Sequence, residues 1–216
     1  MKHILIQNER LARQLDFIIE MDRLKGVLRR SPLADGSRLE NTAEHSWHVA
    51  LAALILADQA DETVNIGHVV RMLLVHDIVE IDAGDTYAYD TSGNLDKAER
   101  EQHAAARLFG LLPDDQAGEL RALWEEFEAR ITPEARFANA LDRMLPLLHN
   151  YLNEGSAWRQ HGVIVDQVRA RMAPVGDGSA ALAGIVEAVL TDSLDRGLFE
   201  RELTIPAGGG ERDECH

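Results

Sequence analysis

Cysteine is almost absent from this chain of 216 residues. The single one, Cys215, is the penultimate residue, so no intramolecular disulfide can form. Long apolar runs are also missing. None approaches the roughly 18 residues that span a membrane, and the first residues lack the apolar segment of a signal peptide. We therefore expect a cytoplasmic protein that has no contact with membranes.

Basic charge is scarce as well. The chain has 22 lysines and arginines against 37 acidic residues, a formal net charge of −15. Such a chain repels polyanions, which excludes non-specific binding to DNA or RNA. A small anionic substrate stays compatible with this charge, provided that a metal ion and a nearby arginine reverse the field within one pocket.

Apolar residues recur at helical spacing through most of the chain, and alternating runs of β-branched residues are scarce. Asn41, with Glu44 three residues later, is typical of a capping box that begins a helix. The pattern predicts helices over 8–25, 42–60, 65–81, 95–112, 114–130, 133–153, 156–173 and 179–197, with loops over 29–38 and 82–94.

No internal repeat and no linker divides these helices. The length suits one domain of ordinary size, with 45% hydrophobic and 27% charged residues. The expected fold class is therefore all-α. We expect one helical domain over residues 1–203 and a glycine-rich, disordered tail over residues 204–216.

Two histidines and two aspartates form a possible ligand set for one divalent metal ion: His45, the adjacent His76 and Asp77, and the distant Asp142. Imidazole nitrogens and carboxylate oxygens together suit Mn, Fe, Co, Ni or Zn. A His-Asp pair alone arises easily by chance, so the surrounding pattern has to support it.

Each of these residues has an ordinary alternative role. On one helix, His76 and Asp77 would lie about 100° apart and both reach one ion, but His76 can also cap the helix. Asp142 interrupts an apolar helix face, where a carboxylate needs either a metal or an ion pair. His45 can be a surface residue beside Glu44. His48, one turn further on, is a weaker candidate ligand.

Further carboxylates follow the His-Asp pair. Glu80 lies three residues after Asp77, on the same face of the predicted helix, which suits a general base that orients water. Asp85, in the turn after Gly84, can reach over a pocket, and Asp82 is a rival acid in the same stretch.

The order His, His-Asp, Asp within a helical chain resembles the HD-domain metal-dependent phosphohydrolases. The likeness is greatest to their 5′-deoxynucleotidase branch, which includes HD-domain-containing protein 2. It covers roughly residues 10–155. The segments that carry it are Glu40-Asn-Thr-Ala-Glu-His-Ser46, His76-Asp-Ile-Val-Glu-Ile-Asp-Ala-Gly-Asp85, Leu123-Trp-Glu-Glu-Phe-Glu128 and Glu134-Ala-Arg-Phe-Ala-Asn-Ala-Leu-Asp142.

The resemblance implies an HD-domain helical bundle and a role for each site residue. His45, His76, Asp77 and Asp142 would bind the metal, and Glu80 would be the catalytic carboxylate. Asp85 would contact the sugar or assist proton transfer. Arg30, fifteen residues before the first histidine, would grip the phosphate.

One position departs from the pattern of the family. Bacterial members place a tryptophan after that arginine, against the deoxyribose, whereas this chain has Ser31. The preference for deoxyribose over ribose is therefore open. Tyr87 and Tyr89 can supply a replacement aromatic wall or can simply pack the loop.

We therefore expect a metal-dependent phosphomonoesterase that hydrolyses nucleoside 5′-monophosphates, with one divalent ion (Co, Mn, Zn, Fe, Ni or Mg). One rival is a pyrophosphohydrolase or phosphodiesterase for a larger nucleotide, although no cluster of lysine or arginine is evident near the site. Another is a non-catalytic interaction protein with a structural metal. A homodimer is expected in either case, through the 133–153 helix and the region of Trp158.

Overall fold

The structure, a computed structural model, describes residues 7–90 and 93–199. Helices dominate it, and the strands form one small antiparallel pair, so the all-α prediction is confirmed. In chain order the elements are α1 (Glu9–Met21), η1 (Asp22–Gly26), β1 (Leu28–Pro32), β2 (Leu39–Asn41), α2 (Thr42–Ile55), η2 (Ala57–Gln59), α3 (Ile66–Val75), α4 (Glu80–Ala83), α5 (Lys97–Phe109), α6 (Asp114–Ala129), α7 (Pro133–Leu152), α8 (Ser156–Gln160), α9 (Val165–Met172), η3 (Ala173–Asp177) and α10 (Ala180–Asp195). The expected tail over 204–216 lies outside the described residues.

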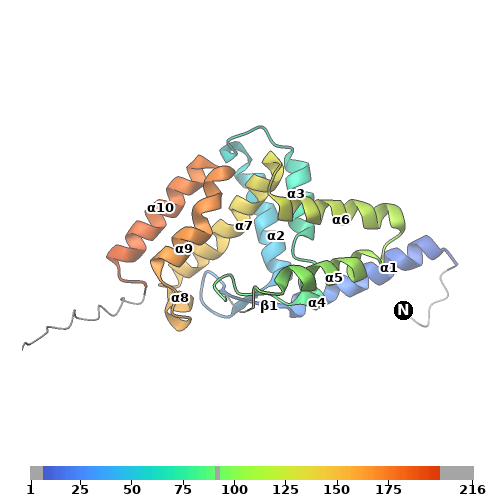
Figure 1. Ribbon diagram of the computed structural model, residues 1–216, viewed down its shortest axis with the longest axis horizontal. Helices are drawn as coiled ribbons and strands as arrows, with labels where there is room; N and C mark the ends of the chain where they lie inside the picture. Colours follow the sequence, from blue (N-terminus) through green and yellow to red (C-terminus); the bar gives the residue numbers. More distant parts are fainter. Residues whose placement is uncertain (1–6, 91–92, 200–216) are drawn as a thin grey trace, which may run out of the picture.

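Helices α2, α3 and α7 form the middle of the molecule. Figure 1 shows α8, α9 and α10 on one side of them, and α1, α5 and α6 on the other. The central helices pack through side chains that are fully buried, among them Val49, Val69, Leu73 and Leu141. This apolar contact holds α2, α3 and α7 in a fixed relation; α2 and α7 carry predicted site residues, and His76 and Asp77 directly follow α3.

The capping box at the start of α2 is confirmed. The Asn41 side chain accepts a hydrogen bond from the Glu44 backbone N–H at 3.0 Å, and the Glu44 carboxylate accepts one from the Asn41 N–H at 2.7 Å. Because the helix begins at Thr42, His45 lies in its first turn.

The loop predicted over 29–38 is wrong in part, because β1 pairs antiparallel with β2 as a hairpin. Alternation was hard to recognise in strands this short and polar. The single helix predicted over 65–81 is also wrong. It ends at Val75, and the chain continues through tight turns, with Ile78 N–H bonded to the Val75 carbonyl, into the short helix α4.

The helix predicted over 156–173 is likewise divided, into α8 and α9. Gly162 lies between them with φ of +62°, a left-handed conformation that favours glycine and that ends a helix. The other predicted helices are present, with ends that differ by a few residues. Among the described helices, none has the length and apolar character needed to cross a membrane.

The surfaces that we expected to form a homodimer are used inside the chain. Trp158 is 1% exposed and stacks on Phe199, with ring centroids 4.6 Å apart. The apolar residues of α7, including Phe137, Leu141 and Leu147, are buried in the core. Trp158 and these residues of α7 are therefore not exposed to a second copy, and the expected homodimer stays a prediction.

Candidate metal centre and cleft

Three of the predicted metal ligands meet although they come from different helices. His45 lies in the first turn of α2, His76 directly follows α3, and Asp142 lies within α7. One ligand atom from each lies within 4.8 Å of the others. His45 Nε2 is 3.0 Å from Asp142 Oδ1, and His76 Nε2 is 3.6 Å from the same oxygen.

Asp77 completes the group. Its Oδ2 lies 3.1 Å from His76 Nε2 and 4.0 Å from His45 Nε2. Burial favours the neutral carboxyl, but His76 and Arg29 hold the pKa of Asp77 below its usual range. Burial favours the neutral form of Asp142 as well, but the hydrogen bond from His45 and the nearby His76 lower its pKa well below the usual value. The structure therefore brings all four predicted ligands together, in surroundings that favour the ionised form of both carboxylates.

The histidines are oriented for metal binding. His45 Nδ1 is 3.2 Å from Glu40 Oε2, and His76 Nδ1 is 2.8 Å from the Leu73 carbonyl. Such contacts fix the ring and leave the other nitrogen for a metal. His76 Nε2 is buried without a hydrogen-bond partner. The donor set therefore consists of His76 Nε2, His45 Nε2 and the carboxylates of Asp77 and Asp142, and it fits a divalent ion.

Arg29 and Glu40 support this group, and the sequence analysis assigned neither of them a role. Arg29 Nη1 donates to Asp77 Oδ2 at 2.8 Å, and Arg29 Nε lies 3.6 Å from Glu40 Oε2. Burial opposes charge on Arg29, but Asp77 and Glu80 raise its pKa. Arg29 could have been recognised from its place beside Arg30. Glu40 could have been recognised because it begins the segment that contains His45.

Glu80 lies beside the metal group on α4. Its Oε2 accepts a hydrogen bond from Thr42 Oγ1 at 2.9 Å, and the residue is 6% exposed. Burial and the nearby Asp77 carboxylate raise the pKa of Glu80 well above its usual value. The predicted helix had placed Glu80 on one face with Asp77, but here the turns after α3 and the hydrogen bond from Thr42 fix its position.

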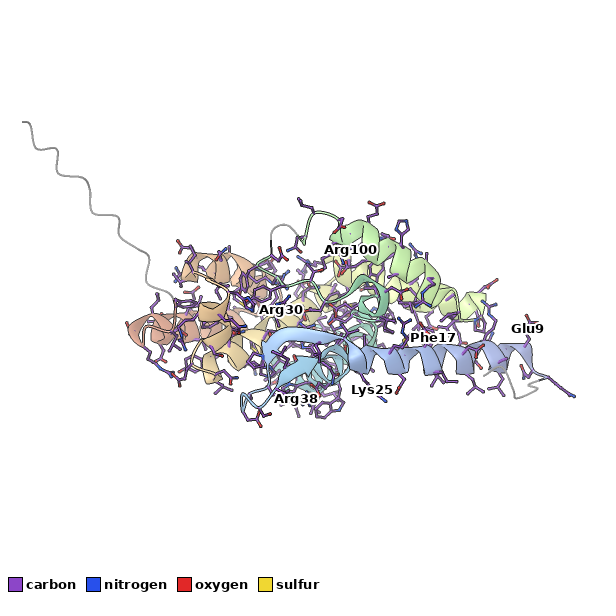
Figure 2. The ribbon with its side chains drawn as sticks, turned by 90° about the horizontal axis from the view of Figure 1, so that it is seen from below. Glu9, Phe17, Lys25, Arg30, Arg38 and Arg100 are labelled. Atoms are coloured by element: carbon purple, nitrogen blue, oxygen red, sulfur yellow. The ribbon has the colours of Figure 1, made fainter. Side chains whose placement is uncertain are left out.

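A cleft of about 980 Å³, partly open to solvent, leads to these residues. Gly84 ends α4 with φ of +74°, and Asp85 follows it into the wall of the cleft. Burial raises the pKa of Asp85. Arg30 and Ser31 of the hairpin also line this cleft. Figure 2 shows Arg30 near the middle of the molecule, whereas Arg38 of the same hairpin lies at its edge.

Tyr87 and Tyr89 line the cleft beyond Asp85. Their rings meet edge to face, with centroids 5.2 Å apart. Burial raises the pKa of Tyr87 to about 12. The two side chains line the cleft and also pack against the hydrophobic core, so a wall against the sugar stays a prediction.

The two rival residues lie elsewhere. His48 stacks on His149, with ring centroids 5.6 Å apart, and lies with Glu40 and His149 in a separate group of potential ligands. Asp82 forms ion pairs with Arg107 and Arg23 and does not line the cleft. Neither belongs to the metal group around His45.

An arginine cluster (Arg130, Arg143 and Arg171) also lines the cleft. The sequence indicated no cluster of basic residues near the site, and this prediction is wrong. α6, α7 and α9 bring together arginines that are far apart in the chain. Arg143 Nη1 donates to the Arg171 carbonyl at 3.0 Å. Burial, with repulsion from Arg171 and Arg130, lowers the pKa of Arg143 to about 10.

Comparisons with known proteins agree with this geometry. A family model described as HD domain matches residues 21–182. The 5′-deoxynucleotidase HDDC2 of Homo sapiens is 33% identical over 131 residues, 58% of this chain and 63% of that protein. The protein of the same name from Bos taurus is 34% identical over 131 residues, 58% of this chain and 62% of its own length. The matched region thus spans less than two thirds of these relatives.

Solved structures are similar over more of the chain. A structure described as a predicted metal-dependent phosphohydrolase from Magnetospirillum magnetotacticum MS-1 is 54% identical, with a TM-score of 0.85. The match covers 89% of this chain and 96% of that one. A conserved hypothetical protein from Pyrococcus furiosus is 21% identical with a TM-score of 0.56, over 81% and 98% of the two chains, and shows the fold alone.

Proposed function

The chain belongs to the HD domain family, and on that premise we propose that it is a metal-dependent phosphomonoesterase that hydrolyses nucleoside 5′-monophosphates to nucleoside and phosphate. The convergence of His45, His76, Asp77 and Asp142 at the end of a cleft carries this proposal. The similarity to the 5′-deoxynucleotidases supports the choice of substrate.

His45, His76, Asp77 and Asp142 would hold a divalent ion, which would supply Lewis acidity and would lower the pKa of a bound water. Glu80 orients the attacking water and accepts its proton. Two observations support this role: Glu80 is held by Thr42 and lies outside the group of ligands. A positioned carboxylate of this kind contributes about 10²- to 10⁴-fold to rate.

Arg30 binds the phosphate, because its guanidinium lines the cleft and a planar fork of donors matches phosphate oxygens. Arg29 is less free to do so, since it is ion-paired with Asp77. Asp85 contacts the sugar or assists proton transfer from the cleft wall. Transfer of a phosphoryl group depends mainly on such positioning and on electrostatic stabilisation.

A substrate screen tests the proposal directly. Purified protein is assayed for phosphate release from ribo- and deoxyribonucleoside 5′-monophosphates, with Co, Mn, Zn, Fe, Ni or Mg added in turn. We expect release of free phosphate with at least one of these ions. Pyrophosphate or triphosphate from longer substrates, without phosphate from monophosphates, would favour the rival reaction.

The variant Glu80→Gln separates catalysis from metal binding. We expect it to keep its metal and fold while losing roughly two to four orders of magnitude in kcat. Asp82→Asn is the matched control, because Asp82 lies outside the cleft and should tolerate the change. Wild-type kcat in Glu80→Gln, with metal bound, would move the catalytic role to another carboxylate such as Asp85, whereas a non-catalytic interaction protein would release no phosphate in either form.

We also propose a cytoplasmic homodimer. On α2, Trp47, Leu51, Leu54 and Ile55 share one face and are 39% to 70% exposed, and Leu74 on the adjacent α3 is 50% exposed. An apolar face of this kind is typical of an interface. Light scattering of wild type and Leu54→Glu tests it: we expect a dimer and a monomer respectively.

A further inference from the structure

The arginine cluster (Arg130, Arg143 and Arg171) has no role in the proposed reaction. Arg130 caps the end of α6, Arg143 lies within α7, and Arg171 lies in the last turn of α9. All three line the cleft that contains the metal group. Three cations from separate helices therefore face one part of a cavity in a chain with a net charge of −15.

Carboxylates lie near the cluster without pairing with it: Asp142 and Glu128 favour the charge on Arg143 from a distance. Within residues 7–90 and 93–199, no carboxylate forms an ion pair with any of the three, whereas Arg29, Arg107 and other arginines are paired. Arg143 is 4% exposed, and its Nε is buried without a hydrogen-bond partner. An unpaired, buried guanidinium beside two like charges is costly, which makes a bound anion the natural partner.

Helix ends explain part of the cluster. Arg130 and Arg171 lie at the C-termini of α6 and α9, where the helix dipole favours a cation. Arg143 lies nine residues before the end of α7, so no such effect applies to it. Among the residues that the structure describes, its guanidinium makes one hydrogen bond, from Nη1 to the Arg171 carbonyl. The other N–H groups of the Arg143 guanidinium are thus the donors that we expect to bind a ligand.

The cluster faces a different part of the cleft from the reacting phosphate. Asp142 and Arg143 are consecutive on α7 and so diverge by about 100°. Asp77, in the metal group, is paired with Arg29 rather than with the cluster. Tyr89 lies near the cluster, since Arg143 and Arg171 both act on its phenol. Its ring neighbour Tyr87 lies near Arg30 instead.

We infer that the arginine cluster binds a second phosphate group of the substrate, carried apart from the one that is hydrolysed. The inference rests on the proposed function and narrows its substrate class to nucleoside 3′,5′-bisphosphates. In a 5′-diphosphate the two phosphates are bonded to each other, and both would lie at the metal group. Three guanidinium groups suit a dianion, which bidentate hydrogen bonds hold well.

The test compares 2′-deoxyadenosine 5′-monophosphate with the 3′,5′-bisphosphate in wild type, Arg143→Gln and Arg171→Gln. We expect wild type to show a KM for the bisphosphate that is lower by roughly tenfold to a hundredfold, the scale of hydrogen bonds to charged groups. In both variants this advantage should shrink at least tenfold. Arg169→Gln, on the same helix but outside the cleft, is the matched control and should keep the advantage.

Calorimetric binding of 2′-deoxyadenosine 3′-monophosphate separates this inference from the proposed function. Suppose that this nucleotide binds in a way that depends on Arg143 and Arg171, but that the protein hydrolyses neither nucleotide. This result would support the second phosphate site and would contradict the proposed phosphomonoesterase function. Hydrolysis of the 5′-monophosphate with no gain from the 3′-phosphate would sink the second phosphate site alone. Equal losses for both substrates in the variants would also overturn it, because the cluster would then bind the reacting phosphate. Arg171→Gln gives the answer if Arg143→Gln does not fold.

Discussion

Replacing Thr42 by valine tests how Glu80 is held. Valine has nearly the shape of threonine but lacks the hydroxyl that donates to Glu80 Oε2 at 2.9 Å. Thr42 is completely buried, and its backbone N–H bond to the Val27 carbonyl is unaffected by the change. The capping box of Asn41 and Glu44 also stays intact. The variant therefore removes the contacts of one hydroxyl, with Glu80 and, at 3.5 Å, with the Val27 carbonyl, and little else.

The expected loss follows from the strength of that bond. A hydrogen bond to a charged group contributes about 1.5–3 kcal/mol, and each 1.36 kcal/mol in the barrier is about tenfold in rate. If the reaction needs Glu80 ionised and in place, kcat should fall by roughly 10- to 150-fold. KM should stay nearly constant, because Thr42 does not line the cleft.

The pH dependence gives a second readout. Burial and Asp77 raise the pKa of Glu80, and the hydrogen bond from Thr42 partly lowers it. Without the hydroxyl, the pKa of Glu80 rises further. A base acts in its ionised form, so the acidic limb of the rate profile should move to higher pH in Thr42→Val.

The assay is phosphate release from 2′-deoxyadenosine 5′-monophosphate across a pH series, with the metal content of each protein measured. Thr42→Ser keeps the hydroxyl and should restore most of the rate. A Thr42→Val protein that retains its metal, together with wild-type kcat and an unmoved acidic limb, would refute the role given to Glu80.

Three further changes test the rest of the site. Asp77→Ala should lose the metal and activity while circular dichroism still shows a helical fold; stoichiometric metal in this variant would contradict its role as a ligand. Ser31→Trp should raise the ratio of kcat/KM for dAMP over AMP by rebuilding a wall against the sugar, and a strong deoxy preference already present in wild type would show this reasoning to be wrong. Asn41→Ala should cost about 1 kcal/mol through loss of the cap, seen by calorimetry as a lower Tm, and an unchanged Tm would argue against the cap.

Local patterns were read correctly from the sequence. The capping box at Asn41 places His45 in the first turn of α2, and the isolated Asp142 in an apolar face is explained by the histidines that meet it. These residues were recognisable because a short-range rule or an energetic penalty marks each of them.

Features that depend on tertiary contact were not predictable. Helix α3 ends at Val75 although the apolar pattern continues, because the turns that follow fit Glu80 against Thr42. The members of the arginine cluster come together only when three helices pack, so the distribution of charge along the chain did not reveal the cluster. The sequence did not distinguish Arg29 from its neighbour Arg30, because only the folded hairpin brings Arg29 to Asp77.

The ion pair between Arg29 and Asp77 implies an order of assembly. Ionised carboxylates that lie close together in a site with little water repel one another. Many small metal proteins fold only when a metal ion binds and offsets this repulsion. Here the chain supplies its own counterion, from a hairpin that lies 48 residues earlier in the sequence. Folding can therefore precede metal loading, and a chelator should strip the metal from a protein that stays folded and can be reloaded.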